Sequence, residues 1–61
     1  MFVSFWDMRR GSQVTINTDY IQAMCLQDDG MALIDAGNYT YVVGTKVYDQ
    51  LLQILGLKTL D

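Results

Sequence analysis

The chain has 61 residues, 51% of them hydrophobic, and its seven acidic and four basic side chains leave a net charge of −3. This acidic balance argues against a phosphate-binding surface, which needs clustered Lys and Arg, so nucleic acid is not an expected partner. One cysteine and no histidine exclude an internal disulfide and argue against a zinc site, and no apolar run approaches the roughly 18 residues of a membrane span.

The first expected strand covers residues 2–7, which are aromatic and favour β-structure. Because side chains alternate along a strand, Val3, Phe5 and Asp7 share one face. Phe2, Ser4 and Trp6 share the other. Neither face is cleanly polar, so this strand is expected either inside a barrel or against another subunit.

A second strand, residues 12–17, follows a turn in which Gly11 is available for a positive φ. Its alternation predicts that Val14 and Ile16 point inward. The next residues, 17–19, have short polar side chains that bond nearby backbone groups, which predicts a corner with one turn of 3₁₀ helix. This corner is expected to place Tyr20 and Ile21 on the core.

Three further strands are expected at residues 21–27, 31–36 and 39–43, separated by the turns Asp28-Asp29-Gly30 and Gly37-Asn38. Strands joined by such short turns pair as an antiparallel meander. Gly30 is expected in the left-handed conformation. Residues 31–34 are apolar on both faces, as in a central strand that is covered on both sides.

One helix is expected at about residues 46–55, with Thr45 as its N-cap after the strand-breaking Gly44. Its apolar face is predicted from helical spacing and consists of Val47, Tyr48, Leu51, Leu52, Ile54 and Leu55. Gly56 suits a Schellman ending. A helix this short must dock on the sheet or on a neighbour, and residues 58–61 are expected to form a frayed tail.

The sequence therefore predicts one α+β domain over residues 1–61: an antiparallel meander of about five strands, curled toward an SH3-like barrel and closed by a C-terminal helix. A domain of this size buries only about 60% of the surface that its unfolded chain exposes. Since disulfides and metals are not available to stabilise it, we expect a homo-oligomer, a dimer or higher, or an obligate protein partner. With no membrane span and no signal sequence, a cytoplasmic protein is the default expectation.

The order of these elements resembles the FlbD-like family of small proteins encoded in flagellar operons. The matching residues are 14–21, the turn Asp29-Gly30, the strand Tyr41-Val42-Val43 and the helix that contains Val47 and Leu51. A Phe/Trp-rich first strand departs from the family pattern, and a related small barrel from a phage or mobile element is an alternative. The resemblance implies a small accessory or regulatory protein without enzymatic activity, and it transfers no catalytic residue.

Candidate catalytic residues are few. Cys25 lies in the middle of a strand, where a free cysteine is usually a small buried hydrophobe, and no histidine or nearby cation activates it. Turn chemistry explains Asp28 and Asp29 better than acid/base catalysis or calcium binding does. No nucleophile–base pair or metal set can be assembled, so the sequence predicts no enzyme, no catalytic residue, no metal and no cofactor.

The apolar composition predicts a non-enzymatic protein-interaction or assembly module, because aromatic residues are enriched at interface hot spots. The hypothetical interface consists of Phe5, Trp6, Tyr41, Tyr48 and Leu52.

The alternative function is a nucleic-acid-binding small barrel that uses Arg9 and Arg10, the only basic cluster, beside the aromatic first strand. Two arginines at a hairpin tip are more often solvated or paired, here with Asp7.

Overall fold

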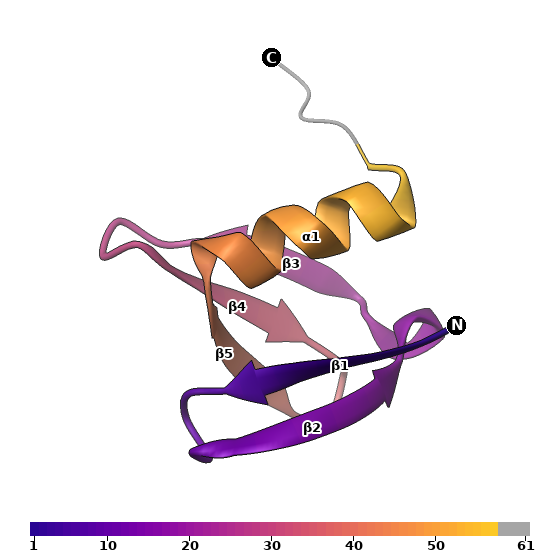
Figure 1. Ribbon diagram of the computed structural model, residues 1–61, viewed down its shortest axis with the longest axis horizontal. Helices are drawn as coiled ribbons and strands as arrows, with labels where there is room; N and C mark the ends of the chain where they lie inside the picture. Colours follow the sequence, from indigo (N-terminus) through magenta and orange to yellow (C-terminus); the bar gives the residue numbers. More distant parts are fainter. Residues whose placement is uncertain (58–61) are drawn as a thin grey trace.

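The computed structural model describes residues 1–57 of the chain. Within this range the elements are, in order, β1 (Phe2–Asp7), β2 (Ser12–Asn17), the 3₁₀ helix η1 (Thr18–Tyr20), β3 (Ala23–Leu26), β4 (Met31–Asp35), β5 (Thr40–Gly44) and α1 (Thr45–Leu55) (Figure 1). The strands pair antiparallel as two sheets, β1-β2 and β3-β4-β5. The predicted α+β meander is confirmed, but the two sheets do not close into a barrel.

The bounds of β1 and β2 are those predicted, whereas the later strands are shifted or shorter. β3 begins two residues later than predicted because Ile21 is held by the 3₁₀ turn, where its backbone N–H donates to the carbonyl of Thr18 at 3.1 Å. β5 begins one residue later because the backbone N–H of Ala36 bonds to the carbonyl of Tyr39 at 2.9 Å and so includes Tyr39 in the turn. The predicted tail, residues 58–61, lies outside the described residues.

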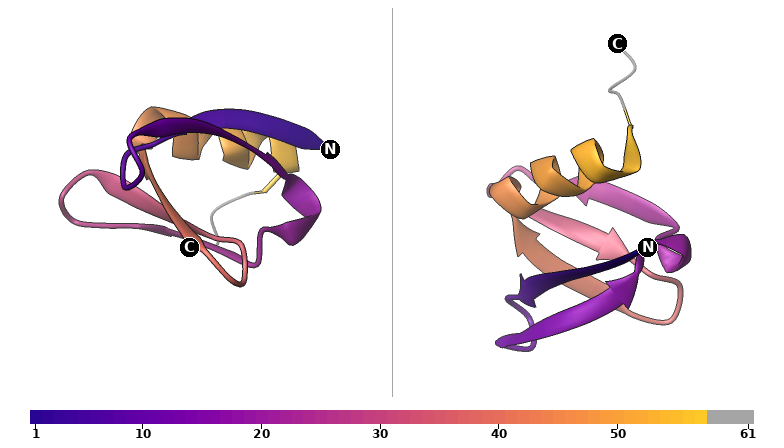
Figure 2. Two further views of the ribbon diagram at one scale, coloured as in Figure 1. Left: turned by 90° about the horizontal axis from the view of Figure 1, so that it is seen from below. Right: turned by 45° about the vertical axis from the view of Figure 1, so that its right-hand side comes forward.

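The core lies between the two sheets and beneath α1. Its fully buried apolar side chains come from four different elements: Phe5, Ala32, Ile34, Val43 and Leu51. In β1 the face with Val3, Phe5 and Asp7 points inward and the face with Phe2, Ser4 and Trp6 points outward. Figure 2 shows that α1 and the β1–β2 hairpin lie on the same side of the β3-β4-β5 sheet.

The corner after β2 is stabilised by Asn17, whose side-chain Oδ1 accepts the backbone N–H of Asp19 at 3.1 Å. Ile21 packs against the core, as predicted. The prediction for Tyr20 is wrong, because its side chain is largely exposed. Tyr20 is the last residue of η1, where successive side chains point about 120° apart, so it does not share the direction of the buried Thr18.

The central hairpin turns at Gly30, which has a φ of 84° and therefore lies in the left-handed region, as predicted. The turn is closed by two further bonds. The backbone N–H of Gln27 donates to the carbonyl of Met31 at 2.8 Å, and the backbone N–H of Met31 donates to Oδ1 of Asp29 at 2.9 Å. The bond to Asp29 gives this residue a structural part in the turn.

The helix α1 begins one residue earlier than predicted. Its N-cap is Gly44, which has no side chain to accept a hydrogen bond, so the prediction of Thr45 as the N-cap is wrong. The ending is as predicted: Gly56 has a φ of 68°, and the backbone N–H of Leu57 donates to the carbonyl of Leu52 at 3.0 Å, as in a Schellman motif. Among residues 1–57, α1 is too short to cross a bilayer, and no other α-helix is present.

Candidate functional site

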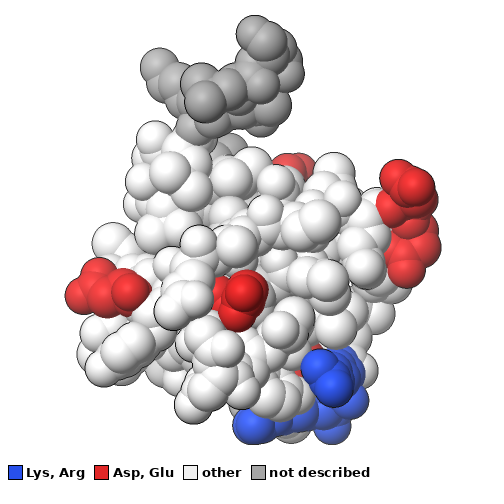
Figure 3. All heavy atoms as spheres, turned by 180° about the vertical axis from the view of Figure 1, so that it is seen from behind, with Lys and Arg blue, Asp and Glu red and all other residues white. Residues whose placement is uncertain are grey.

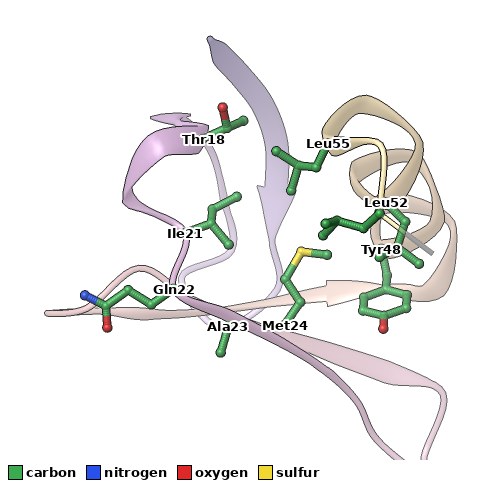
Figure 4. A pocket seen from close by; sticks show the side chains of 9 residues that line it. Thr18, Ile21, Gln22, Ala23, Met24, Tyr48, Leu52 and Leu55 are labelled. Atoms are coloured by element: carbon green, nitrogen blue, oxygen red, sulfur yellow. The ribbon is translucent and has the colours of Figure 1, made fainter. Parts of the chain in front are cut away.

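A groove with a volume of about 510 Å³ lies between α1 and the segment that leads into β3. We call it the α1–β3 groove. Its lining residues are mostly apolar: Thr18, Ile21, Gln22, Ala23, Met24, Tyr48, Leu52, Leu55 and Leu57. In Figure 4 the side chains of Ile21, Met24, Leu52 and Leu55 point into the space between the two walls. The side chains of Gln22 and Ala23 point away, so these two residues contribute main chain to the groove.

Two of the five predicted interface residues, Tyr48 and Leu52, line this groove. Trp6 lies elsewhere, on the outer face of β1, and is 54% exposed. The prediction for Phe5 is wrong, because its side chain is only 6% exposed and belongs to the core. Because side chains alternate along β1, Phe5 points to the buried face and Trp6 to the exposed face, so these two neighbours cannot belong to one surface.

Tyr41 occupies an intermediate position. Its ring packs edge-on against Phe5, with 5.6 Å between the ring centroids, and lies 4.7 Å from the ring of Tyr39. Tyr41 also lines a smaller depression whose rim includes the exposed rings of Phe2 and Tyr20. It therefore joins the core to the surface rather than contributing to the α1–β3 groove.

Asp7 is the fully buried charged residue of the described chain, with 0% exposure. Its Oδ1 accepts the backbone N–H groups of Arg9 at 3.0 Å and Val42 at 3.1 Å, and its Oδ2 accepts the hydroxyl of Tyr39 at 3.3 Å. Burial by itself would raise the pKa of Asp7, but the donors from Val42, Arg9 and Tyr39 hold this pKa below its ordinary value. Sequence periodicity places Asp7 on one face of β1 with Val3 and Phe5. It does not indicate that this face is buried or that Asp7 bonds to β5, and the one signal was an aspartate on the same strand face as two large apolar side chains.

The two arginines of the first hairpin lie over the ring of Tyr39. The guanidinium carbon is 4.3 Å from the ring centroid for Arg10 and 5.7 Å for Arg9, both within the range of a cation–π contact. Arg10 also approaches Asp7, with 4.0 Å between its Nε and Oδ2 of the carboxylate. Both cations therefore have partners inside the molecule.

The outer face of the β3-β4-β5 sheet has an apolar row beside a row that contains Asp35 and Thr40. The register places Cys25, Leu33 and Val42 in one row across the three strands, all pointing away from the core. Met31 lies on the same face. Cys25 is exposed, so the expectation of a buried cysteine is wrong. Figure 3 shows the molecule from the side on which these strands lie, and most of the surface there is uncharged.

Among residues 1–57, no three His, Cys, Asp or Glu side chains gather as the ligands of a metal would. The thiol of Cys25 contacts only the carbonyl of Leu26, at 3.8 Å. The chemistry that this surface offers is apolar contact, together with the hydrogen-bonding groups of an exposed strand edge.

The fold and these surfaces define a small antiparallel α+β domain with exposed apolar side chains. No protein-family model matches the chain, and neither a curated protein nor a solved structure does. The resemblance to the FlbD-like family therefore stays a prediction.

Proposed function

We propose that this protein is a non-enzymatic interaction module that assembles with copies of itself, as a dimer or a higher oligomer, through its outer apolar surface. The observation that carries the proposal is the distribution of large apolar side chains. Among residues 1–57, eight large hydrophobic residues are 46% or more exposed, whereas the buried core contains five hydrophobic residues. Trp6 is one of these eight residues. Exposed apolar surface marks interaction sites in soluble proteins where it is contiguous.

The surface proposed for self-association consists of Trp6 and the row Cys25, Leu33 and Val42. β1 lies beside β5, since the backbone N–H of Met8 donates to the carbonyl of Val42 at 2.7 Å. The row is free of charged side chains. A standard interface buries about 800 Å² on each partner. This is less than a fifth of the 4369 Å² surface of one copy. It is more than four side chains expose, so the contact must also include the residues around them.

The experiment is sedimentation velocity over protein concentrations from about 1 μM to about 1 mM, the range that spans weak to firm association. The expected result is a mass that rises above the 6.9 kDa of one chain. Trp6→Lys and Leu33→Lys each place a charge in the proposed contact and should return the protein to the mass of one chain.

The matched control is Gln53→Lys, which adds the same charge at an exposed position of α1 outside the proposed contact. It should leave the mass of the assembly unchanged, and circular dichroism should show that all three variants fold. A wild-type protein that stays at the mass of one chain over the whole range would contradict self-assembly. A loss of assembly in the Gln53→Lys variant would contradict the proposed surface.

No structural observation favours nucleic-acid binding by this protein. The two arginines that it would use lie over Tyr39, and Arg10 is beside Asp7. This function would be supported if the protein bound a single-stranded oligonucleotide and if the affinity fell with added salt and with replacement of both arginines.

A further inference from the structure

The strand β3 has one side without a partner. It is the first strand in the order β3-β4-β5, so β4 covers only one of its two edges. The backbone N–H of Gln27 faces β4, where it bonds to Met31. Successive residues of an antiparallel strand face the partner and face away in turn, so the N–H and C=O groups of Leu26 and Met24 face outward.

These outward groups are not satisfied by the described residues. Within residues 1–57, the one hydrogen bond that reaches either residue from outside the ladder is that of the Cys25 thiol to the carbonyl of Leu26, at 3.8 Å, and a thiol is a weak donor. Proteins usually protect such an edge with a lysine, a proline or an inward charge. β3 reads Ala-Met-Cys-Leu and has none of these.

The open edge borders the α1–β3 groove at Met24, and Leu26 lies two residues beyond it. Residues 21–24 form one wall, and Tyr48, Leu52 and Leu55 of α1 form the other (Figure 4). The groove thus combines backbone hydrogen-bonding groups with an apolar helix wall. This combination suits an extended chain, whose backbone pairs with the strand while alternate side chains enter the apolar space.

The charges around the groove indicate which kind of extended peptide it would bind. Its lining residues are all uncharged. Asp19 precedes β3, and Asp28 and Asp29 follow it, so exposed carboxylates stand at both ends of the strand. The whole chain has a net charge of −3. A chain that is apolar at its centre and basic at its ends complements this arrangement.

We propose that the α1–β3 groove binds an extended peptide segment of another protein, with alternating apolar side chains and basic residues at both ends, which adds to the edge of β3 as a further strand. β3 spans about 13 Å at about 3.3 Å per residue, so four or five residues of the peptide make the contact. The site uses the edge of β3, whereas the surface proposed for self-association uses the Cys25 side chain on the outer face of the same strand. The two proposals have separate tests, and each can fail without the other.

The experiment uses the full chain labelled with ¹⁵N and a synthetic peptide of about nine residues, in which alternating valine and serine are flanked by two lysines at each end. Two-dimensional NMR follows the backbone amides at up to about 1 mM peptide. The expected result is saturable binding that shifts the amides of Met24 and Leu26 and slows their hydrogen exchange. If wild-type protein self-associates, the titration is made in the Trp6→Lys variant.

Two modified peptides test strand addition directly. One carries backbone N-methyl groups at the valines and the other at the serines. Because an added strand offers only alternate N–H groups to its neighbour, one of these peptides should bind at least tenfold more weakly and the other should keep its affinity. Equal binding of both peptides would overturn the backbone pairing.

Two protein variants test the walls of the groove. Leu52→Gln should weaken binding at least tenfold, whereas Gln53→Ala, its exposed neighbour, should not. Leu26→Pro removes an outward N–H, and Leu26→Ala keeps that N–H while removing the side chain, so only the proline variant should lose binding strongly. If Leu26→Pro does not fold, the N-methylated peptides and Leu52→Gln still decide the question.

Three other results would overturn the proposal. The first is no binding at the highest peptide concentration. The second is equal binding of a peptide with glutamates in place of the lysines, which would remove the argument from charge. The third is a change in the Met24 and Leu26 amides of wild-type protein with its own concentration, with no peptide present, because a second copy would then occupy the groove.

Discussion

Oδ1 of Asp7, at the end of β1, accepts the backbone N–H of Val42 in β5 at 3.1 Å. The two residues are 35 positions apart in the sequence. The backbone N–H of Met8 donates to the carbonyl of Val42 at 2.7 Å, so both backbone polar groups of Val42 are used by the end of β1. These bonds join the two-stranded sheet to the three-stranded one at a place where no strand ladder does so.

Replacing Asp7 should therefore destabilise the fold. Asp7→Ala leaves two partly buried backbone N–H groups and the Tyr39 hydroxyl without their acceptor and should lower the free energy of unfolding by about 3 kcal/mol. Asp7→Asn keeps one oxygen and should lower it by about 1–2 kcal/mol. Urea unfolding followed by circular dichroism measures both. Asp28→Asn, at an exposed turn position, is the control and should change stability little.

The same carboxylate predicts a pH dependence. Since the pKa of Asp7 is lower in the folded protein than in the unfolded chain, its contribution to stability is fully present above the unfolded value of about 3.9 and is lost as the pH falls through the folded value. We expect the difference in unfolding free energy between wild type and Asp7→Asn to shrink as the pH is lowered below about 4. A difference that stays constant from neutral to acidic pH would contradict this assignment.

Gly30 and Gly44 form a matched pair for the backbone of the turns. A Cβ at either position would meet no atom within 4 Å, so space is not what distinguishes them. Gly30 has a φ of 84°, and Gly44 has a φ of −79°. Gly30→Ala should lower the free energy of unfolding by about 1–2 kcal/mol through backbone strain, whereas Gly44→Ala should not lower it. Thermal unfolding of the two variants measures this difference. An equal loss of stability in both variants would contradict the prediction.

The N-terminus of α1 can be improved. Gly44 occupies the N-cap position without a side chain to accept a backbone N–H. Gly44→Ser supplies this acceptor and also reduces the conformational freedom of the unfolded chain, so it should raise the free energy of unfolding by about 0.5–1 kcal/mol. Gly44→Ala supplies only the second effect and serves as the comparison in a urea titration. A serine variant no more stable than the alanine variant would show that the cap does not form.

Much of the local structure could be predicted from the sequence, because it depends on neighbouring residues. The alternation of β1 and β2, the left-handed Gly30 and the Schellman ending at Gly56 are all set within a few residues. The apolar helix spacing also identified Tyr48 and Leu52, which the structure places in the α1–β3 groove. The predicted N-cap at Thr45 failed, because the chain passes from β5 into α1 without an intervening residue.

The residues of the candidate site could be identified only from the tertiary structure. Periodicity divided β1 into two faces but could not say which is buried, since both contain aromatic residues. Packing against Ile34, Val43 and Leu51 buries Phe5 and leaves Trp6 in solvent. The groove is formed by β3 and α1, which are separated in sequence by two strands.

The sequence by itself determined which segments become strands, turns and helix, and that one small chain would carry more apolar side chains than its core can bury. Only the tertiary structure decided which of these side chains face water, that Asp7 joins the first strand to the last, and that an open strand edge lies beside an apolar helix wall. The physical reason is range: backbone preferences act between neighbours, whereas burial and hydrogen bonds such as that of Asp7 to Val42 depend on residues that meet only when the sheets pack.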